Sequence, residues 1–213
     1  ADKGKDPIPV FKKSISLVVG GTSGIGKDIA YIMAEKGINL VLLARREEAL
    51  IKIKKDLESN FKIRVTVISS DLSQVSEYKK IHDECKRNDF MPDFLVNHAG
   101  YGTLDSFHKI SYENHIKFIN VLSTSVVSLT QLFIQNMLDN GFGRIINIAS
   151  LAGFAPASNS GGMYTAVKSM VIKHSEGIHK EYRDKNIFCC AVCPGFTHTE
   201  FHDQMGDFKS SIP

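Results

Sequence analysis

Tyr164 and Lys168 are the residues of this sequence whose types and spacing best suit chemistry. They lie four residues apart in the stretch 163–168, which we expect to be helical, so both side chains project from one face. A free tyrosine ionises near pH ~10, and an ammonium group one turn away favours the phenolate and lowers that pKa. The pair could then pass a proton to or from a reacting oxygen. Such pairs also arise by chance, with the tyrosine packed and the lysine in water, so other residues must decide.

Length and composition limit the function classes. With 213 residues we expect one domain, and 43% hydrophobic with 23% charged residues is ordinary for a globular protein. The net charge of +3 is small and the basic residues are interspersed with acids, which argues against a nucleic-acid partner. No apolar run approaches the ~20 residues that a membrane span needs.

The chain ends and the cysteines bear on location. The first nine residues are polar and contain no initiator Met, which leaves open a trimmed anchor or signal. Cys189, Cys190 and Cys193 fall in or beside an apolar stretch that we expect to be a strand, so we interpret them as buried, inert thiols. Free thiols fit a reducing compartment, and we expect a cytoplasmic protein.

Apolar stretches alternate with helical ones along the whole chain. Strands are expected at 15–19, 39–43, 63–69, 94–96, 144–148 and 187–192, and helices at 25–35, 47–60, 73–87, 111–140 and 162–183. The strands are apolar throughout, which is typical of a parallel sheet buried on both faces. The pattern therefore predicts a doubly wound α/β domain, in which ligands bind beyond the carboxyl ends of the strands.

A glycine-rich turn joins the first strand to the first helix. Glycines let the backbone approach a phosphate, and the helix that follows supplies free N–H groups. The run 21–27 nearly matches a phosphate loop of the Walker type, but Asp28 stands where a magnesium-binding Ser or Thr is needed. Gly20, Gly24 and Gly26 instead fit a dinucleotide loop.

The end of the second strand indicates which dinucleotide. An NAD site usually places an acid there to bind the ribose hydroxyls, whereas this chain has Arg45 and Arg46. A guanidinium group suits a 2′-phosphate and favours NADP(H) over NAD(H). The alternative is that the two arginines merely begin a solvated helix, since paired arginines are common on protein surfaces.

Together these segments resemble the short-chain dehydrogenase/reductase family over nearly the whole chain. The resemblance rests on the glycine loop with Val19 in place of Thr, on the run Asn97-His98-Ala99-Gly100 in place of Asn-Asn-Ala-Gly, on the Tyr164 and Lys168 pair, and on Asp71, Asn120, Ser150, Pro194, Gly195, Thr197 and Thr199. Several segments look most like the bacterial DltE-type branch, and a weaker similarity is to 3-ketoacyl and hydroxysteroid reductases. His98 could be a polar substitute for asparagine or a histidine of the site.

The resemblance implies a Rossmann fold of three layers and a role for each matching residue. Ser150 and Tyr164 would hydrogen-bond a substrate carbonyl, Tyr164 would donate the proton, Lys168 would lower the Tyr164 pKa and hold the nicotinamide ribose, and Asn120 would anchor a water that connects Lys168 to solvent. The implied cofactor-binding set is Gly20, Thr22, Ser23, Gly24, Ile25, Gly26, Arg45, Asp71, Leu72, Asn97, Ala99, Gly100, Tyr164, Lys168, Pro194, Gly195, Thr197 and Thr199.

We therefore expect an NADP(H)-dependent oxidoreductase acting on a small carbonyl or alcohol substrate, with no metal. His198 and His202 have ligand-like spacing but no third ligand in a known pattern. Apolar residues expected near the site could line a mildly apolar substrate cleft or pack as core: Phe154, Met163, Phe196, Phe201, Met205 and Phe208. We expect a homodimer or homotetramer paired through the long helices, and we expect the family's lid and last strand to be missing. A non-catalytic NADP(H) sensor or scaffold and, more remotely, a P-loop NTPase are the alternatives.

Overall fold

A computed structural model describes residues 14–102, 105–156 and 162–195. Its centre is a parallel sheet of six strands in the order β3-β2-β1-β4-β5-β6. The strands are β1 (Ile15–Val19), β2 (Asn39–Ala44), β3 (Val65–Ser69), β4 (Phe94–Asn97), β5 (Gly143–Ile148) and β6 (Ile187–Val192). This is the doubly wound order, and the predicted Rossmann-type fold is confirmed.

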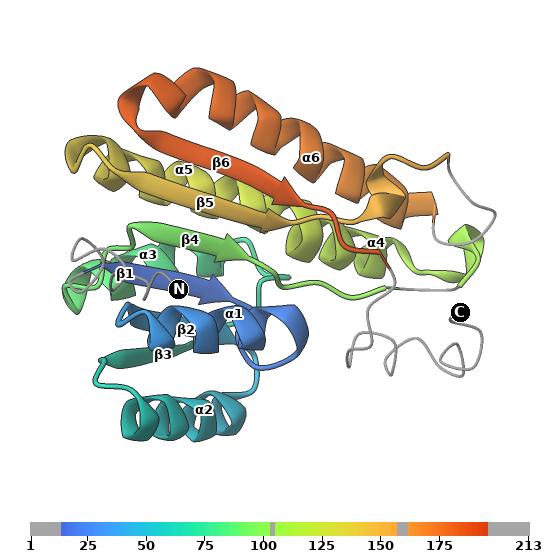
Figure 1. Ribbon diagram of the computed structural model, residues 1–213. Helices are drawn as coiled ribbons and strands as arrows, with labels where there is room; N and C mark the ends of the chain where they lie inside the picture. Colours follow the sequence, from blue (N-terminus) through green and yellow to red (C-terminus); the bar gives the residue numbers. More distant parts are fainter. Residues whose placement is uncertain (1–13, 103–104, 157–161, 196–213) are drawn as a thin grey trace, which may run out of the picture.

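Helices cover both faces of the sheet and make three layers (Figure 1). Alternate strand residues supply two cores: Leu17 and Val19 pack on one side of β1, and Val18 packs on the other. The helices are α1 (Gly24–Glu35) and α2 (Glu47–Asn60) on one face, and α3 (Ser76–Arg87), α4 (Tyr112–Ile119), α5 (Ser125–Asp139) and α6 (Gly162–Tyr182) on the other.

The expected elements agree with the structure to within a few residues, and the largest shift has a local cause. Helix α3 begins at Ser76 rather than at residue 73. The Asp71 side chain accepts hydrogen bonds from the main-chain N–H and the hydroxyl of Ser73, at 3.0 and 2.9 Å. An Asx turn of this kind competes with helix formation, so the chain turns before the helix starts.

The long helix expected at 111–140 is interrupted by a π-helical segment, η3 (Asn120–Thr124), between α4 and α5. The hydroxyls of Ser123 and Ser125 donate to carbonyls four residues earlier, at 2.9 and 2.8 Å. Such bonds bend or widen a helix, and π-helical turns are frequent at functional sites. The stretch Tyr112–Asp139 is, within the described residues, the one helix long and apolar enough to span a membrane, but half of its apolar window is buried within the fold.

Strand β6 lies at an edge of the sheet, and one of its faces is exposed. Helix α6 packs on the face that carries Ile187 and Cys189, whereas Phe188, Cys190 and Val192 on the other face are exposed. The expectation of buried thiols therefore holds for Cys189 but is wrong for Cys190. Cys190 is exposed because, in the described part of the chain, no helix covers this face of β6 (Figure 1).

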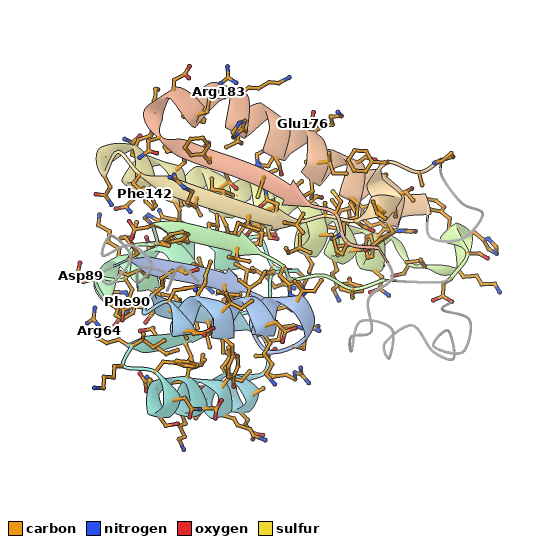
Figure 2. The ribbon with its side chains drawn as sticks, in the orientation of Figure 1. Arg64, Asp89, Phe90, Phe142, Glu176 and Arg183 are labelled. Atoms are coloured by element: carbon orange, nitrogen blue, oxygen red, sulfur yellow. The ribbon has the colours of Figure 1, made fainter. Side chains whose placement is uncertain are left out.

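Stacked arginines lie at the amino-terminal edge of the sheet. The Arg64 guanidinium carbon lies 4.5 Å from the centre of the Phe90 ring, and that of Arg144 lies 4.2 Å from Phe142 and 4.6 Å from Phe188. Figure 2 places Arg64, Phe90 and Phe142 on this side of the molecule, away from the strand arrowheads. The amino-terminal edge is thus packed, and the loops that carry the candidate site leave from the opposite edge.

A glycine fixes how closely the loop after β5 approaches helix α6. Gly153 ends the short helix η4 (Leu151–Gly153), and a Cβ atom there would lie 2.6 Å from Cδ1 of Ile172 and 3.1 Å from the Lys168 carbonyl oxygen. Only a residue without a Cβ permits this contact, which holds η4 beside Lys168.

We predict that Gly153→Ala destabilises the protein by about 1 to 3 kcal/mol, because the added methyl group would overlap Cδ1 of Ile172 and press on the Lys168 main-chain carbonyl group. Gly177→Ala is the matched control. A Cβ atom at this exposed position within α6 would meet nothing within 4 Å, so the substitution should stabilise the protein by up to ~1 kcal/mol through helix propensity. Urea unfolding of both variants tests the pair, and equal effects would contradict the packing argument.

Candidate active site

The sequence-predicted site residues in the described part of the chain gather along the carboxyl edge of the sheet. They lie in the loop after β1, at Arg45 after β2, at Asp71 and Leu72 after β3, at 97–100 at the end of β4, at Ser150 after β5, and at Pro194 and Gly195 after β6. Because the strands are all parallel, these ends meet at one edge, which is the side of the β4, β5 and β6 arrowheads in Figure 1. Thr197 and Thr199 lie outside the described residues.

Ser150 and Tyr164 are joined by a side-chain hydrogen bond. Ser150 directly follows Ala149 at the end of β5, and its Oγ also accepts a hydrogen bond of 3.1 Å from the main-chain N–H of Ala152. That donor orients the hydroxyl, because a lone pair engaged by an N–H leaves the hydroxyl proton to point elsewhere. Sequence reasoning missed this N–H, which belongs to an alanine of no chemical character.

Lys168 is almost fully buried, with 6% of its surface exposed. Its ammonium group donates a hydrogen bond of 2.8 Å to the carbonyl oxygen of Ile148, the last residue of β5. Its Nζ atom lies 5.6 Å from the centre of the Tyr164 ring. Burial lowers the pKa of Lys168 from its usual 10.5 to about 8, because a charged ammonium group loses hydration inside the protein. The structure thus brings the serine, the tyrosine and the lysine together.

The expected lowering of the Tyr164 pKa is wrong for this structure. The Tyr164 pKa is raised, because burial of the half-buried side chain disfavours the phenolate. The Ser150 hydrogen bond acts in the opposite direction without reversing the shift. At neutral pH the phenol therefore keeps its proton and can donate it.

Asn120 is tied to the turn after β3. Its side-chain Nδ2 atom donates to the Ser73 carbonyl oxygen at 2.9 Å, and its main-chain carbonyl oxygen accepts a hydrogen bond of 3.1 Å from the Tyr78 hydroxyl. These bonds join the π-helical segment to the β3–α3 turn, and no hydrogen bond among the described residues joins Asn120 to Lys168. The water-anchoring role stays a prediction.

The glycine loop has the shape that a dinucleotide phosphate needs. Gly20 has a positive φ of +85°, which favours glycine, and a Cβ atom at Gly26 would lie 2.6 Å from the Gly20 carbonyl oxygen. Ser23 is the N-cap residue of α1, and its side chain makes no capping hydrogen bond. The N-terminus of α1 is therefore open to an anion, as the fit of a nucleotide diphosphate requires.

Charged residues stand at the outer end of this loop, after β2 and β3. Arg45 is exposed directly after β2, and Asp71 is held in its turn by Ser73. Both charges act on Tyr101: burial raises the Tyr101 pKa, the Arg45 guanidinium lowers it and the Asp71 carboxylate raises it further. Arg45 and Asp71 therefore lie on the same side of the site, at the ends of the neighbouring strands β2 and β3.

A buried chain of polar side chains supports the site from below. Asn97 donates to the Asn147 side chain at 2.8 Å, and Asn147 donates to the Ser175 hydroxyl at 2.9 Å. This chain of hydrogen bonds joins β4 and β5 to α6, the helix that carries Tyr164 and Lys168. Sequence reasoning missed Asn147 and Ser175 in this role, although an asparagine within the apolar strand 143–148 was a usable signal.

The apolar residues expected around the site divide into two groups. Phe154 is 64% exposed beside η4, and Met163 packs with Tyr164 against a small apolar cluster of Phe118, Leu122 and Val167. Phe196, Phe201, Met205 and Phe208 lie outside the described residues, as do His198 and His202. Among the described residues no group of three His, Cys, Asp or Glu side chains could hold a metal ion.

The buried Lys168 predicts a dependence of stability on pH. The pKa is about 8 in the folded chain and 10.5 when unfolded, so between these values the unfolded chain binds more protons and the free energy of unfolding rises with pH. From pH 8 to pH 10 the rise from this group should be about 2 kcal/mol. In denaturant unfolding without nucleotide, the free energy of unfolding of the wild type should rise by this amount relative to that of Lys168→Met over the same pH range. Parallel pH curves would contradict the prediction.

Comparisons with known proteins agree with this geometry. A family model described as short chain dehydrogenase matches residues 14–209. The very-long-chain 3-oxoacyl-CoA reductase of Macaca fascicularis is 32% identical over 189 residues, covering 87% of this chain and 60% of that protein. Reductase A of the same name from Danio rerio is 34% identical, with 87% and 58% covered. The chain thus spans about three fifths of the length of these relatives.

Solved structures give the same answer. A short-chain dehydrogenase from Sphingobium yanoikuyae in complex with NADPH superposes with a TM-score of 0.88 at 27% identity, covering 94% of this chain and 77% of that one. The relatives' names correspond to the similarity to 3-ketoacyl reductases, and closeness to the DltE-type branch stays a prediction. The chain belongs to the short-chain dehydrogenase/reductase family of NAD(P)-dependent oxidoreductases.

Proposed function

We propose that this protein uses NADP(H) to interconvert a carbonyl compound and its alcohol, with Tyr164 as the proton donor and acceptor. The observation that carries the proposal is the meeting of Ser150, Tyr164 and Lys168, on the side of the sheet where the glycine loop also follows its strand. A sensor or scaffold without turnover would not need these three groups together.

In the reductive direction Ser150 and Tyr164 hydrogen-bond the carbonyl oxygen of the substrate and polarise it. When bound, the nicotinamide supplies the hydride. Tyr164 donates its proton to the oxygen, because its raised pKa keeps the phenol protonated at neutral pH. The Lys168 ammonium then stabilises the phenolate that forms, and its hydrogen bond to Ile148 keeps the charge in place.

The cofactor preference rests on Arg45. An exposed guanidinium after β2 can pair with a 2′-phosphate, which NADPH has and NADH lacks. Asp71 would contact the adenosine, and Gly20, Gly24 and Gly26 would hold the diphosphate. The NADPH named with the Sphingobium structure supports this preference.

For the substrate we propose a carbonyl compound with an apolar body. Leu151 and Phe154, both close to Ser150 along the chain, are 56% and 64% exposed and could contact such a body. The names of the Macaca and Danio relatives make 3-oxoacyl thioesters the first compounds to try.

We also propose a homodimer or homotetramer formed through the long helices.

Tyr164→Phe should bind NADPH like the wild type but lose turnover by a factor of about 10³ or more, because the proton donor is removed and the ring remains. Tyr182→Phe, at the end of the same helix, is the matched control and should keep its activity. NADPH absorbance followed over a panel of ketones and 3-oxoacyl thioesters measures both. Wild-type rates in Tyr164→Phe would refute the mechanism, and NADPH binding without turnover of any compound would favour a sensor.

Arg45→Ala should weaken NADPH binding by roughly 10-fold or more while leaving NADH binding unchanged, because only NADPH carries the 2′-phosphate. Arg64→Ala removes an arginine at the opposite edge of the sheet (Figure 2) and serves as the control. Calorimetric titration with both nucleotides decides the question. Equal losses for NADH and NADPH would overturn the role of Arg45.

A further inference from the structure

His98 stands where the resemblance expects asparagine, and its ring lies against the glycine loop. Its Nδ1 atom is 3.2 Å from the Gly20 carbonyl oxygen. A Cβ atom on Gly26 would lie 2.5 Å from the same Nδ1, and one on Gly20 would lie 3.0 Å from it. The imidazole is therefore packed against both ends of the loop, and of the two readings of His98 the geometry favours the polar substitute.

The direction of this hydrogen bond is fixed by chemistry. A carbonyl oxygen only accepts, so Nδ1 carries the hydrogen and donates it to Gly20. Burial and the nearby Lys168 ammonium lower the His98 pKa below its usual 6.5, while Asp28 and the bond to Gly20 act in the opposite direction. At neutral pH the ring is thus uncharged, with its one N–H directed at the loop.

This hydrogen bond also fixes the orientation of the peptide group between Gly20 and Gly21. The chain has no cis peptide bond among the described residues, and in a trans peptide the C=O and the following N–H point in opposite directions. Because the Gly20 carbonyl points at His98, the N–H of Gly21 points away from His98 and β4. The positive φ of Gly20 allows this orientation.

We propose that His98 is a positioning residue for the cofactor, which holds the Gly20 carbonyl inward so that the loop offers N–H groups, and no carbonyl oxygen, to the diphosphate. The inference rests on the proposed function in requiring a dinucleotide on this loop. It goes further in assigning the loop's shape to a side chain that touches neither the substrate nor the reacting atoms. A carbonyl oxygen turned outward would repel a phosphate, and the hydrogen bond prevents that turn.

The test compares side chains of similar shape with and without an N–H donor. His98→Asn keeps a donor and His98→Leu lacks one. His98→Leu should weaken the binding of NADPH and of NADH by the same factor, roughly 10-fold, because both nucleotides carry the diphosphate and the variant lacks the hydrogen bond to Gly20. His98→Asn should restore both affinities to within about 3-fold of the wild type. If His98→Leu fails to fold, the pair His98→Gln and His98→Met replaces it, with the same expectation.

His115→Leu is the matched control, because His115 also bonds a carbonyl oxygen, that of Phe107 at 3.1 Å, but away from the loop. It should leave both affinities unchanged. Calorimetric titration of the full chain with NADPH and NADH, with thermal unfolding without nucleotide, gives the readouts. Equal binding by the variants with and without the donor overturns the role of His98. A wild type that binds neither nucleotide overturns the proposed function itself.

Discussion

The buried ammonium group of Lys168 is the constraint on which the rest of the site depends. A charge removed from water is unfavourable unless it is hydrogen-bonded, and here the bond goes to the carbonyl oxygen of Ile148 at the end of β5. That bond fixes the distance between α6 and β5. The close approach at Gly153 then holds η4, and with it Ser150, against the same helix. One buried charge thereby helps to hold α6, β5 and η4 together.

The parallel sheet supplies the framework for this arrangement. Its strand order brings β1 and β4 together at the sheet centre, which is the point where the strand order reverses and where open α/β sheets bind their ligands. At this point the Gly20 carbonyl and His98 meet across the two strands. Deeper in the sheet, the side chains of Asn97, Asn147 and Ser175 join the adjacent strands to α6. The glycine loop and the helix that carries Tyr164 and Lys168 are therefore both joined to neighbouring strands of one sheet.

Much of this could be predicted from the sequence, for a physical reason. Apolar strands, a glycine-rich turn and polar residues directly after strands are local patterns, and parallel topology then brings the strand ends together. The failures concern quantities that depend on packing. The sign of the Tyr164 pKa shift depends on burial and not on spacing along a helix. Cys190 differs from Cys189 only in which face of an edge strand it occupies. The partner of His98 lies 78 residues away.

The two shifted pKa values of the site also belong together. Burial raises the pKa of Tyr164 and lowers that of Lys168, because the uncharged form of each is favoured away from water. Near neutral pH this leaves a protonated phenol beside an ammonium group that is close to losing its own proton. The phenolate formed by proton donation would then arise next to a positive charge that is already in place, which lowers the cost of forming it. The same burial that lowers the Lys168 pKa would also strengthen the attraction between its ammonium group and a Tyr164 phenolate, because water would screen that attraction around a solvated lysine.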